Sequence, residues 1–592
     1  MSLVVQKFGG TSVADSEKIL AAARKAVRAH QKGHQVVMVV SAMGKNTDML
    51  IELAGQVNEK PPAREMDMLL STGEQVSVAL MAMAIDSLGY KAVSLTGGQI
   101  GIKTDSTHTK ARIRSISTER VTRLLDQGNI VIAAGFQGID EDLNITTLGR
   151  GGSDTTAVAL AAVLGADQCE IYTDVDGIYT TDPRVLPEAC LVRQVCYDEM
   201  LELASLGAGV MHSRSVEFGK KFNVPIHVRS SLSDVPGSLI VDDSETATMA
   251  VSGAALTKDE ALISVANVPD VPGTIFQIFG PIASKKITVD MIVQNVSENG
   301  NTNVSFTVPR NEAEDAIDAI RISVEELGGQ IRIVDQDVSK VSVVGLGMAE
   351  QTGVANRMFR TLSEAEVNME LITTSEIKIS ALVKRDSALN ALRTVHSEFA
   401  LDQIESPPEP VLPDQLSHDS SPADVIERLR GFGMEALLID NISLDENQSR
   451  ITLTKIPNRP GFAARLFDSI ADKGVFVDMI VQSHADDKIA DITFTIPRKQ
   501  FDAGLEVANS VCAEFGCQGV DSKKEIAKLT VSGVGLRSHT GVAIGMFRAL
   551  STSQINIEAI NTSEVRVNVV VDGKDGQAGI EALKQEFAEA LR

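Results

Sequence analysis

The chain has 592 residues, of which 43% are apolar and 23% charged, and it contains no tryptophan. This length is too great for one hydrophobic core, so we expect several domains. A formal net charge of −24 disfavours nucleic acid and anionic membranes as partners, because the overall field repels both, although local basic groups can still bind small anions.

The cysteines and histidines give no sign of a disulfide framework or a metal site. The five cysteines are scattered and form no CxxC pair, which indicates reduced thiols, and the nine histidines show no zinc-ligand spacing. No presequence pattern precedes the first apolar run at residues 3–5, and no apolar run approaches bilayer length. We therefore expect a cytoplasmic protein without a membrane partner.

Residues 1–240 alternate short β-branched runs with amphipathic segments. This alternation predicts an α/β domain with an open, mainly parallel sheet, whose ligands gather at the carboxyl ends of the strands. The predicted strands are 3–6, 36–41, 92–95, 130–133, 170–173 and 225–228. The predicted helices are 16–30, 74–88, 113–126, 155–164 and 197–206.

Residues 149–156, with the sequence GRGGSDTT, immediately precede an apolar helical run. Gly151, Gly152 and Ser153 are therefore expected at a helix N-terminus, where unpaired N–H groups and the helix dipole favour an anion. Arg150 offers a planar fork for a carboxylate or phosphate. A capped helix with a surface arginine is the alternative, and this stretch alone does not decide between them.

Three further turns carry polar residues. Residues 7–12 (KFGGTS) put a lysine beside paired glycines, either to cradle a phosphate or to pair with a neighbouring carboxylate. Residues 71–75 (STGEQ) open a predicted helix as a capping sequence does. Residues 173–184 fit a nucleotide loop or a turn with Asx bonds. No GxxxxGK or GxGxxG run occurs, so neither P-loop nor Rossmann chemistry is supported.

Taken in order, residues 7–13 (KFGGTSV), 71–74 (STGE), 149–154 (GRGGSD) and 173–177 (TDVDG) resemble the aspartate kinases of the amino-acid kinase family. The resemblance implies transfer of the γ-phosphoryl group of ATP to the β-carboxylate of L-aspartate, giving 4-phospho-L-aspartate for lysine, threonine, methionine and isoleucine synthesis. ATP is then a substrate, and Mg²⁺ is expected on its phosphates through unassigned ligands. The attacking carboxylate is already ionised, so catalysis is mostly positioning and charge compensation.

The same resemblance implies a role for each candidate residue. The catalytic pair is Lys7 and Asp154. The ATP-binding residues are Lys7, Gly9, Gly10, Thr173, Asp174, Tyr179 and Arg184. The aspartate-binding residues are Ser41, Thr47, Glu74, Phe136, Arg150 and Ser153, with Arg150 on the α-carboxylate and Glu74 on the α-ammonium group. Many relatives carry a lysine where this chain has Gly209, so either Arg184, Lys220 or Lys221 compensates, or the nucleotide is held more weakly.

The remainder of the chain is a duplication. The runs 291–294 and 479–482 are both MIVQ, and the runs 352–355 and 540–543 are both TGVA, each pair separated by 188 residues. A shift of 80 residues relates the halves of the first copy, from residue 273 to 353. Tandem copies with internal doubling predict four α+β modules of βαββαβ type, which resemble the ACT domain, a small amino-acid sensor.

These patterns predict the domain boundaries. The catalytic domain is placed at 1–240, and the first module pair at 250–402, with modules at about 262–335 and at 336–402 plus 250–261. A linker follows at 403–424, since residues 401–424 hold five prolines and six acidic residues without Lys or Arg. The second pair is placed at 438–592, with modules at about 450–525 and at 526–592 plus 438–449.

The resemblance implies that the modules pair edge to edge, support a homo-oligomer, expected to be a dimer, and bind lysine and threonine as inhibitors. Asp270 can meet a lysine ε-ammonium group, whereas its counterpart Asn458 has lost that charge, so the copies are expected to differ. The predicted effector-binding residues are Asp270, Gln294, Asn295, Thr352, Asn368, Asn458, Gln482, Thr540 and Asn556. The alternatives are modules that serve only as scaffold, a kinase with another acceptor, and a catalytically inactive sensor. Which effector binds which module, and whether inhibition is concerted, stay open.

Overall fold

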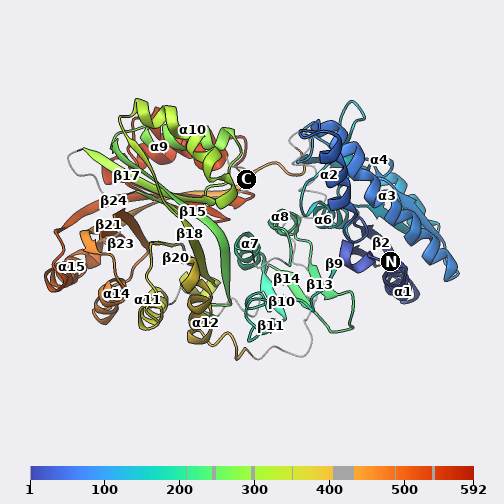
Figure 1. The fold of residues 1–592 in the computed structure, drawn as a ribbon, viewed down its shortest axis with the longest axis horizontal. Coiled ribbons are helices and arrows are strands. Elements are labelled where there is room, and N and C mark those ends of the chain that lie inside the picture. Colours follow the sequence, from blue (N-terminus) through green and yellow to red (C-terminus); the bar gives the residue numbers. More distant parts are fainter. Residues whose placement is uncertain are drawn as a thin grey trace.

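The computed structural model describes residues 2–207, 210–242, 249–294, 300–349, 351, 353–404, 433–486, 489–536 and 541–591. Figure 1 shows two halves beside each other, an N-terminal half in blue to green and a C-terminal half in green to red. The N-terminal half runs to residue 242, and the C-terminal half contains the duplicated part of the sequence.

Within the described residues, the N-terminal half is built on an eight-stranded sheet with the order β12-β14-β13-β9-β1-β2-β6-β3. All neighbours in it are parallel except β13 and β14. A second sheet has the order β5-β4-β7-β8, and β10 pairs with β11 in a hairpin. The strands are β1 (Leu3–Phe8), β2 (Gln35–Val40), β3 (Ala92–Leu95), β4 (Ile102–Thr104), β5 (Ile113–Ile116), β6 (Ile130–Ala134), β7 (Gln137–Ile139), β8 (Ile145–Thr147), β9 (Gln168–Thr173), β10 (Ile178–Tyr179), β11 (Leu191–Val192), β12 (Gln194–Cys196), β13 (Ile226–Ser230) and β14 (Ser238–Val241).

Helices cover both faces of the eight-stranded sheet and bury separate apolar cores. One core joins α1 and α3 to β1, β2 and β6, and the other joins α5, α6, α7 and α8 to the opposite face. The N-terminal helices are α1 (Ser16–Gln31), α2 (Asn46–Val57), α3 (Ala63–Ser87), α4 (Gly97–Ile100), α5 (Glu119–Asp126), α6 (Gly152–Leu164), α7 (Tyr197–Ser205) and α8 (Ser213–Phe222). The predicted α/β class with a mainly parallel sheet is confirmed.

Two predicted helix starts are wrong. Residues 71–75 do not open a helix, because α3 begins at Ala63 after the extended residue Pro62 and carries them in its middle. The predicted helix at 113–126 begins only at Glu119, since Ile113–Ile116 is the strand β5. Local propensity did not distinguish β5, which is held by β4 and by residues from the distant C-terminal half.

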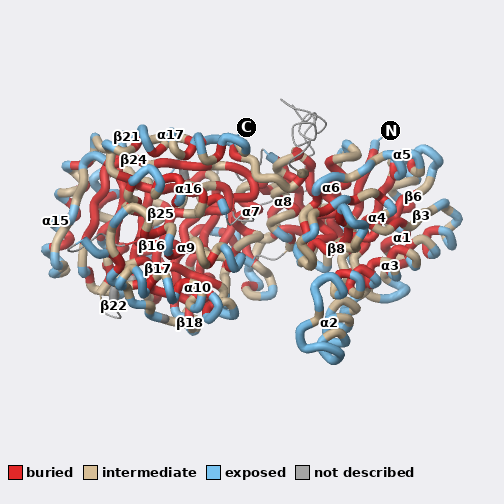
Figure 2. Tube along the Cα trace, turned by 90° about the horizontal axis from the view of Figure 1, so that it is seen from above, coloured by how far each residue is buried: buried red, intermediate tan, exposed pale blue. Residues whose placement is uncertain are grey.

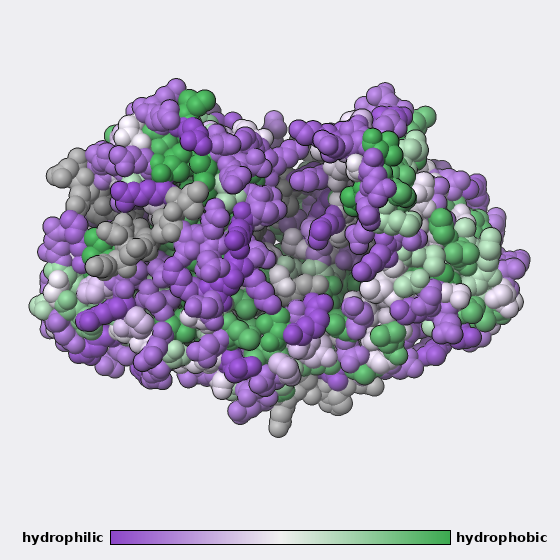
Figure 3. All heavy atoms as spheres, viewed as in Figure 1, coloured by the Kyte–Doolittle hydropathy of each residue, from purple (hydrophilic) through white to green (hydrophobic). Residues whose placement is uncertain are grey.

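Helix α3 is also the one described helix that is long and apolar enough to span a membrane, whereas the sequence pattern predicts no run of that length. Half of its most apolar window is buried inside the protein, where it packs against α1, β3 and β8. The neighbouring α2 has no buried residue and projects from the body in Figure 2. Exposed apolar side chains on these helices include Val57 and Met83, and Figure 3 shows hydrophobic patches on both halves of a mostly hydrophilic face.

The described part of the C-terminal half forms one twelve-stranded antiparallel sheet, with the order β16-β17-β15-β18-β20-β19-β22-β23-β21-β24-β26-β25. Its strands are β15 (Gly253–Pro269), β16 (Ile292–Gln294), β17 (Asn301–Pro309), β18 (Gln330–Val344), β19 (Leu371–Thr374), β20 (Lys378–Lys384), β21 (Leu438–Pro457), β22 (Met479–Asp486), β23 (Ile489–Pro497), β24 (Gly519–Val534), β25 (Ala559–Thr562) and β26 (Arg566–Asp572). Its helices are α9 (Thr274–Ser284), α10 (Ala313–Glu326), α11 (Val354–Glu364), α12 (Ala388–Glu398), α14 (Phe462–Asp472), α15 (Phe501–Phe515), α16 (Gly541–Thr552) and α17 (Gly576–Glu586).

The long strands are shared between modules. Strands β15 and β18 pair along most of their length, and the register shifts between Thr257 and Glu260. Residues of β15 before that shift lie beside the part of β18 that also pairs with β20, so they belong to the second module of the pair. Strands β21 and β24 repeat this arrangement in the second copy.

The four modules close into a ring within one chain. Strand β19 of the first copy pairs antiparallel with β22 of the second, with Ile372 opposite Gln482. At the other junction Thr562 donates a hydrogen bond to the Asp290 carbonyl at 2.9 Å, and α9 packs on α16 through Phe279 and Phe547. A shared apolar cluster fills the inner face of the sheet with residues of both copies. The predicted edge-to-edge pairing therefore occurs inside a single chain.

Helix α7 forms much of the contact between the halves. The side chain of Glu202 is fully buried, pairs with Lys378 Nζ at 2.9 Å and accepts a hydrogen bond from the Glu564 amide at 2.9 Å. Glu199 accepts hydrogen bonds from Ser252 Oγ at 2.7 Å and from the Leu346 amide at 3.2 Å. Two buried carboxylates of one short helix thus bind both copies of the duplicated half.

Candidate active site

The predicted site residues follow adjacent strands of the eight-stranded sheet. Thr173 ends β9 and Asp174 follows it, Lys7 lies near the end of β1, Ser41 follows β2, and Phe136 follows β6. The order β9-β1-β2-β6 therefore sets Thr173 and Asp174 on one side of Lys7, and Ser41 and Phe136 on the other. Parallel strands bring these carboxyl ends to one edge, as expected for a ligand site.

Lys7 and Asp154 form an ion pair at the centre of this edge. The Lys7 Nζ atom contacts Asp154 Oδ1, and each side chain is only 11% exposed. Asp154 belongs to the first turn of α6, where the helix dipole favours a carboxylate. The structure thus brings together the two residues predicted to be catalytic.

The loop after β1 lies close to neighbouring backbone and requires glycine. A Cβ atom on Gly10 would lie 2.7 Å from the Ala42 carbonyl oxygen, which is too close for any side chain. A Cβ on Gly9 would lie 3.5 Å from Lys7 Nζ, so the Gly9 backbone faces that amino group. The adjacent Ser12 is buried, and its Oγ atom has no hydrogen-bond partner among the described residues.

The loop at residues 149–152 begins α6 with a glycine in left-handed conformation. Gly151 is the N-cap with φ 71°, and a Cβ on it would lie 2.3 Å from the Cβ of His212. Arg150 is exposed and pairs with no described carboxylate. The helix N-terminus predicted for Gly151, Gly152 and Ser153 is confirmed, with an exposed arginine beside it.

Glu74 is a buried carboxylate from the middle of α3. Its Oε1 accepts a hydrogen bond from the Ala42 amide at 3.1 Å, whereas its Oε2 has no partner among the described residues. Burial raises the pKa of Glu74 from its ordinary value of 4.5 to about 7. An unpaired buried carboxylate oxygen is satisfied well by an ammonium group.

The other predicted aspartate residues come from the ends of β2 and β6 and from the first turns of α2 and α6. Ser153 packs against Gly135, because a Cβ on Gly135 would lie 2.6 Å from Ser153 Oγ. Phe136 has φ 68°, a strained conformation for a bulky residue, and its amide donates a hydrogen bond to Thr156 Oγ1 at 3.2 Å. The Ser41 amide donates to the Phe8 carbonyl at 3.1 Å, and Thr47 lies in the first turn of α2.

The predicted nucleotide residues lie beside β1 but are more open. The Gly9 amide donates to the Tyr172 carbonyl at 3.3 Å, so Thr173 and Asp174 follow directly beside the glycine loop. Arg184 is exposed and pairs with Asp182 at 2.9 Å, and Asp182 raises the pKa of its guanidinium group. Burial, followed by the charge of Asp176, raises the pKa of Tyr179.

The structure shows what the residues named as substitutes for the missing phosphate-binding lysine contact. Gly209 lies outside the described residues. Lys220 pairs with Asp198 at 2.5 Å, and Lys221 Nζ donates to the Met434 carbonyl at 2.8 Å and the Ala436 carbonyl at 2.6 Å. Both lysines are thus engaged elsewhere, and among the named candidates Arg184 is the exposed cation.

The predicted effector residues gather at the two junctions of the module ring. At one junction Asp270 Oδ1 accepts hydrogen bonds from Asn556 at 2.8 Å and Gln294 at 3.4 Å. At the other, Asn368 donates to Asn458 Oδ1 at 3.2 Å, and Gln482 donates to the Met369 carbonyl at 2.7 Å. The predicted residues Asn295, Thr352 and Thr540 lie outside the described residues.

The second junction has a carboxylate that is not among the predicted effector-binding residues. Glu370 accepts hydrogen bonds from Asn368 and from Asn458, both at 3.2 Å. The charge lost at Asn458 is therefore supplied by another strand. The repeat aligns Glu370 with Asp290, but its relation to Asn458 could not be predicted, because it depends on the pairing of β19 with β22.

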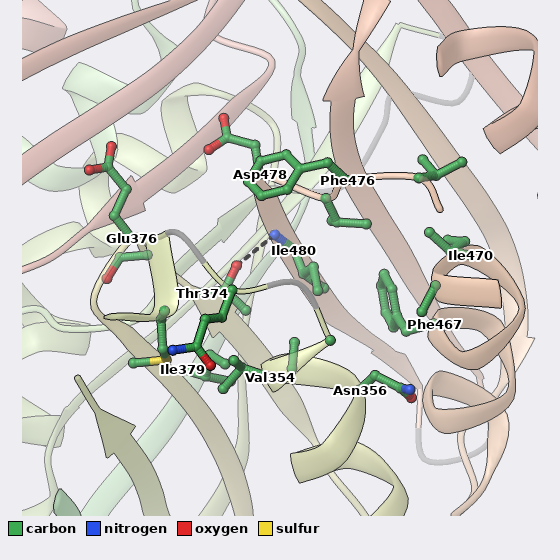
Figure 4. Close-up of a pocket in the computed structure, with 18 of the residues that line it drawn as sticks. Val354, Asn356, Thr374, Glu376, Ile379, Phe467, Ile470, Phe476, Asp478 and Ile480 are labelled. Atoms are coloured by element: carbon green, nitrogen blue, oxygen red, sulfur yellow. Dashed lines mark hydrogen bonds between the residues drawn. The ribbon is translucent and has the colours of Figure 1, made fainter. Parts of the chain in front are cut away.

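A cavity of about 380 Å³ lies at the same junction, between α11 and α14 (Figure 4). Its lining includes Val354, Thr374, Glu376, Phe467 and Asp478. The Ile480 amide donates to Thr374 Oγ1 at 2.8 Å across the two copies, as the dashed line in Figure 4 shows. Sequence comparison used residues 374–376 only as a repeat marker and did not predict this cavity.

Comparisons with known proteins agree with this arrangement. The model of the amino acid kinase family matches residues 2–230, and the model of the ACT domain matches residues 263–322, 341–399, 454–511 and 529–587. An aspartate kinase of Stutzerimonas stutzeri is 49% identical over 404 residues, which make up 68% of this chain and 98% of that protein. An aspartokinase of Pseudomonas aeruginosa is 49% identical over 405 residues, with the same two shares.

A solved structure matches the whole length. The crystal structure of aspartate kinase from Synechocystis is 38% identical, with a TM-score of 0.52, and the match covers 100% of this chain and 98% of that one. The family models give one amino acid kinase domain followed by four ACT domains. The structure has the mainly parallel sheet in the first of these ranges and the twelve-stranded antiparallel sheet in the others. The chain belongs to the aspartate kinase family.

Proposed function

We propose that the chain transfers the γ-phosphoryl group of ATP to the β-carboxylate of L-aspartate. The observation that carries this proposal is the strand order, which sets Thr173 and Asp174 on one side of the Lys7–Asp154 pair, and Ser41 and Phe136 on the other. The relatives that match most of their length are aspartate kinases, which supports the same reaction.

In this mechanism the protein positions two anionic reactants and compensates their charge. Lys7 faces the phosphates beside the amides of Gly9 and Gly10, and Asp154 fixes the direction of its amino group. Arg150 binds the aspartate α-carboxylate, and Glu74 binds its α-ammonium group. The β-carboxylate is then directed at the γ-phosphorus without a general base.

Magnesium enters as part of the nucleotide in this proposal. Among the described residues no three His, Cys, Asp or Glu side chains converge into a metal site. Magnesium usually keeps several waters and binds through substrate phosphates with one or two carboxylates. Asp174, which follows β9, is the predicted nucleotide residue that carries a carboxylate.

Trapping of the acyl phosphate with hydroxylamine tests the reaction. The wild-type chain with ATP, Mg²⁺ and aspartate should yield aspartyl hydroxamate, and Lys7→Met should lower kcat by at least about 100-fold through loss of charge compensation. Arg150→Met should mainly raise the KM for aspartate. The surface variant Lys18→Met is the matched control, and folded wild-type protein that forms no hydroxamate would refute the proposal.

We further propose that lysine, threonine or both inhibit the enzyme by binding at the ring junctions. Asp270 is bonded to two amide groups and to no described cation, which leaves a carboxylate available to an effector ammonium group. Asp270→Ala should weaken lysine inhibition at least about tenfold while turnover without inhibitor is unchanged. Asp318→Ala, on the exposed face of α10, is the control, and unchanged inhibition in Asp270→Ala would place the lysine site elsewhere.

We also propose the predicted domain boundaries, a cytoplasmic location and a homo-oligomer. The matched family ranges all fall inside the predicted domains, which supports the boundaries. Because β19 and β22 already pair within the chain, we place a contact between chains on another surface than these two strand edges.

A further inference from the structure

Residues 433–436, immediately before β21, pack against the N-terminal half. The Met434 amide donates to the Arg114 carbonyl at 3.0 Å, beside strand β5. The Met434 side chain is 4% exposed and belongs to the apolar core of the N-terminal half. Figure 1 shows the orange start of β21 reaching from the C-terminal half toward α8. This docked segment joins the second module pair to the proposed catalytic domain.

Glu435 is the charged centre of the docked segment. Its two carboxylate oxygens bind Arg214, with Oε2 at 2.5 Å from Nε and Oε1 at 2.7 Å from Nη2. The Ile113 amide donates to the same Oε1 at 2.5 Å. The Glu435 side chain is 7% exposed and that of Arg214 is 14% exposed. A two-point carboxylate–guanidinium pair of this burial fixes orientation as well as distance.

Arg214 uses its remaining donors to hold backbone next to the proposed aspartate site. Its Nη1 donates to the Leu148 carbonyl at 2.6 Å, and its Nη2 donates to the Ala111 carbonyl at 2.6 Å. Leu148 directly precedes the loop that carries Arg150. The Leu148 amide in turn donates to the Phe136 carbonyl at 2.9 Å. One guanidinium group thus links the docked segment to the loop between Phe136 and Arg150.

We infer that Glu435 is a positioning residue for aspartate binding, which holds Arg214 and thereby the Arg150 loop in the geometry that receives the α-carboxylate. Arg214 lies in the first turn of α8, where the helix dipole disfavours a cation, so the Glu435 carboxylate is needed to keep the guanidinium group in place. Without it, Arg214 is expected to turn toward solvent and release the Leu148 carbonyl. The inference rests on the proposed aspartate site and gives the second module pair a direct mechanical connection to it.

Substitution of Glu435 separates this role from simple support of the fold. Glu435→Gln keeps the shape of the side chain but removes its charge, so the KM for aspartate should rise about tenfold because Arg150 is displaced. The values of kcat and of the KM for ATP should stay within about twofold, since the Lys7 loop is held by other contacts. Met434→Ala is the matched control, because it weakens packing of the same segment and leaves the Arg214 pair intact.

A second variant keeps the inference testable if Glu435→Gln does not fold. Arg214→Lys retains the charge but cannot bind the carboxylate and both carbonyl groups together, so it should show the same selective rise in the KM for aspartate. Equal KM values for wild type, Glu435→Gln and Arg214→Lys would overturn the inference, as would an equal rise in Met434→Ala. Wild-type protein that forms no hydroxamate would instead refute the proposed function.

Discussion

Individual residues of the site are held in environments that disfavour them before the ligands bind. Glu74 is buried with one unpaired carboxylate oxygen, and Phe136 has a left-handed backbone. Such features cluster at functional sites because they are relieved or used when a ligand binds. Glu74 gives the clearest consequence that can be measured.

The pKa of Glu74 predicts how aspartate binding depends on pH. The carboxyl group has a pKa of about 7 in the empty site, so it is increasingly protonated as the pH falls below that value. The ammonium group of aspartate needs the ionised form, so the KM for aspartate should rise by up to about tenfold for each pH unit below 7. Steady-state kinetics between pH 5.5 and 8.5 measure this, and a flat KM in that window would contradict the assignment.

The same shift predicts the effect of Glu74 on stability. A carboxyl group whose pKa rises from 4.5 to about 7 on folding opposes folding once it ionises, so the free energy of unfolding falls as the pH rises through this window. The full effect is roughly 3 kcal/mol, reached above pH 7. Glu74→Gln should therefore be more stable than wild type at pH 8 and nearly equal at pH 4.5, with much weaker aspartate binding. Urea unfolding at the two pH values is the measurement, and an equal stability difference at both would be inconsistent with this.

The glycine loop predicts a steric effect on activity. Gly10→Ala places a Cβ atom 2.7 Å from the Ala42 carbonyl oxygen, so the loop must move and kcat should fall at least about tenfold. The matched control is Gly55→Ala in α2, where a Cβ meets nothing within 4 Å. That variant should keep full activity and gain up to about 1 kcal/mol of stability, because alanine favours a helix. Equal activity of the two variants would contradict the close approach.

Single residues could be predicted where they lie in or near a recognisable turn. Lys7 and Arg150 belong to glycine-rich turns beside a strand or helix end, which indicate an anion site without deciding it, and their roles were predicted from the family resemblance. Glu74 was predicted as a ligand of the amino group, but its helix start was misplaced, since serine and threonine before it imitate a cap. Glu435 is 221 residues from Arg214, and an isolated glutamate after a proline-rich segment gives no signal of that partner.

At the scale of elements, the sequence predicted those that bury a regular apolar face. The helices Ser16–Gln31 and Tyr197–Ser205 were predicted to within one residue at each end, because their amphipathic patterns are strong. The short strand Ile113–Ile116 was missed, since its partners are a neighbouring strand and the docked residues 433–436. The closing of the module ring likewise depends on edges that no local pattern marks.

Helix α7 gives the prediction for this scale, because it carries a buried ion pair between the halves. Lys378→Met leaves the Glu202 carboxylate buried without its cation, so the free energy of unfolding should fall by about 3–5 kcal/mol. Arg465→Met removes the partner of Glu514 in a pair that is half exposed, and it should lower stability by less than about 1 kcal/mol. Thermal unfolding compares the two, and similar losses would show that the α7 contact is not a buried anchor.

The whole molecule is a catalytic domain attached to a ring made by duplication. The 188-residue repeat predicted four modules, and the structure shows that the two copies complete each other within one chain. A chain ending at residue 404 should expose the edge of β19 and associate into dimers, because an open strand edge recruits another strand. Cross-linking of β19 to β19 between truncated chains would detect this, and the full chain, whose β19 is covered by β22, should give no such cross-link. A monomeric truncated protein would show that the second copy is not needed to cover that edge.

The most direct test of the central claim is a crystal structure with a non-hydrolysable ATP analogue and aspartate. The account predicts the terminal phosphate beside Lys7, the aspartate α-carboxylate on Arg150 and its ammonium group on Glu74, with the β-carboxylate facing the phosphate. A triphosphate bound away from Lys7, or an aspartate bound away from Arg150, would contradict it.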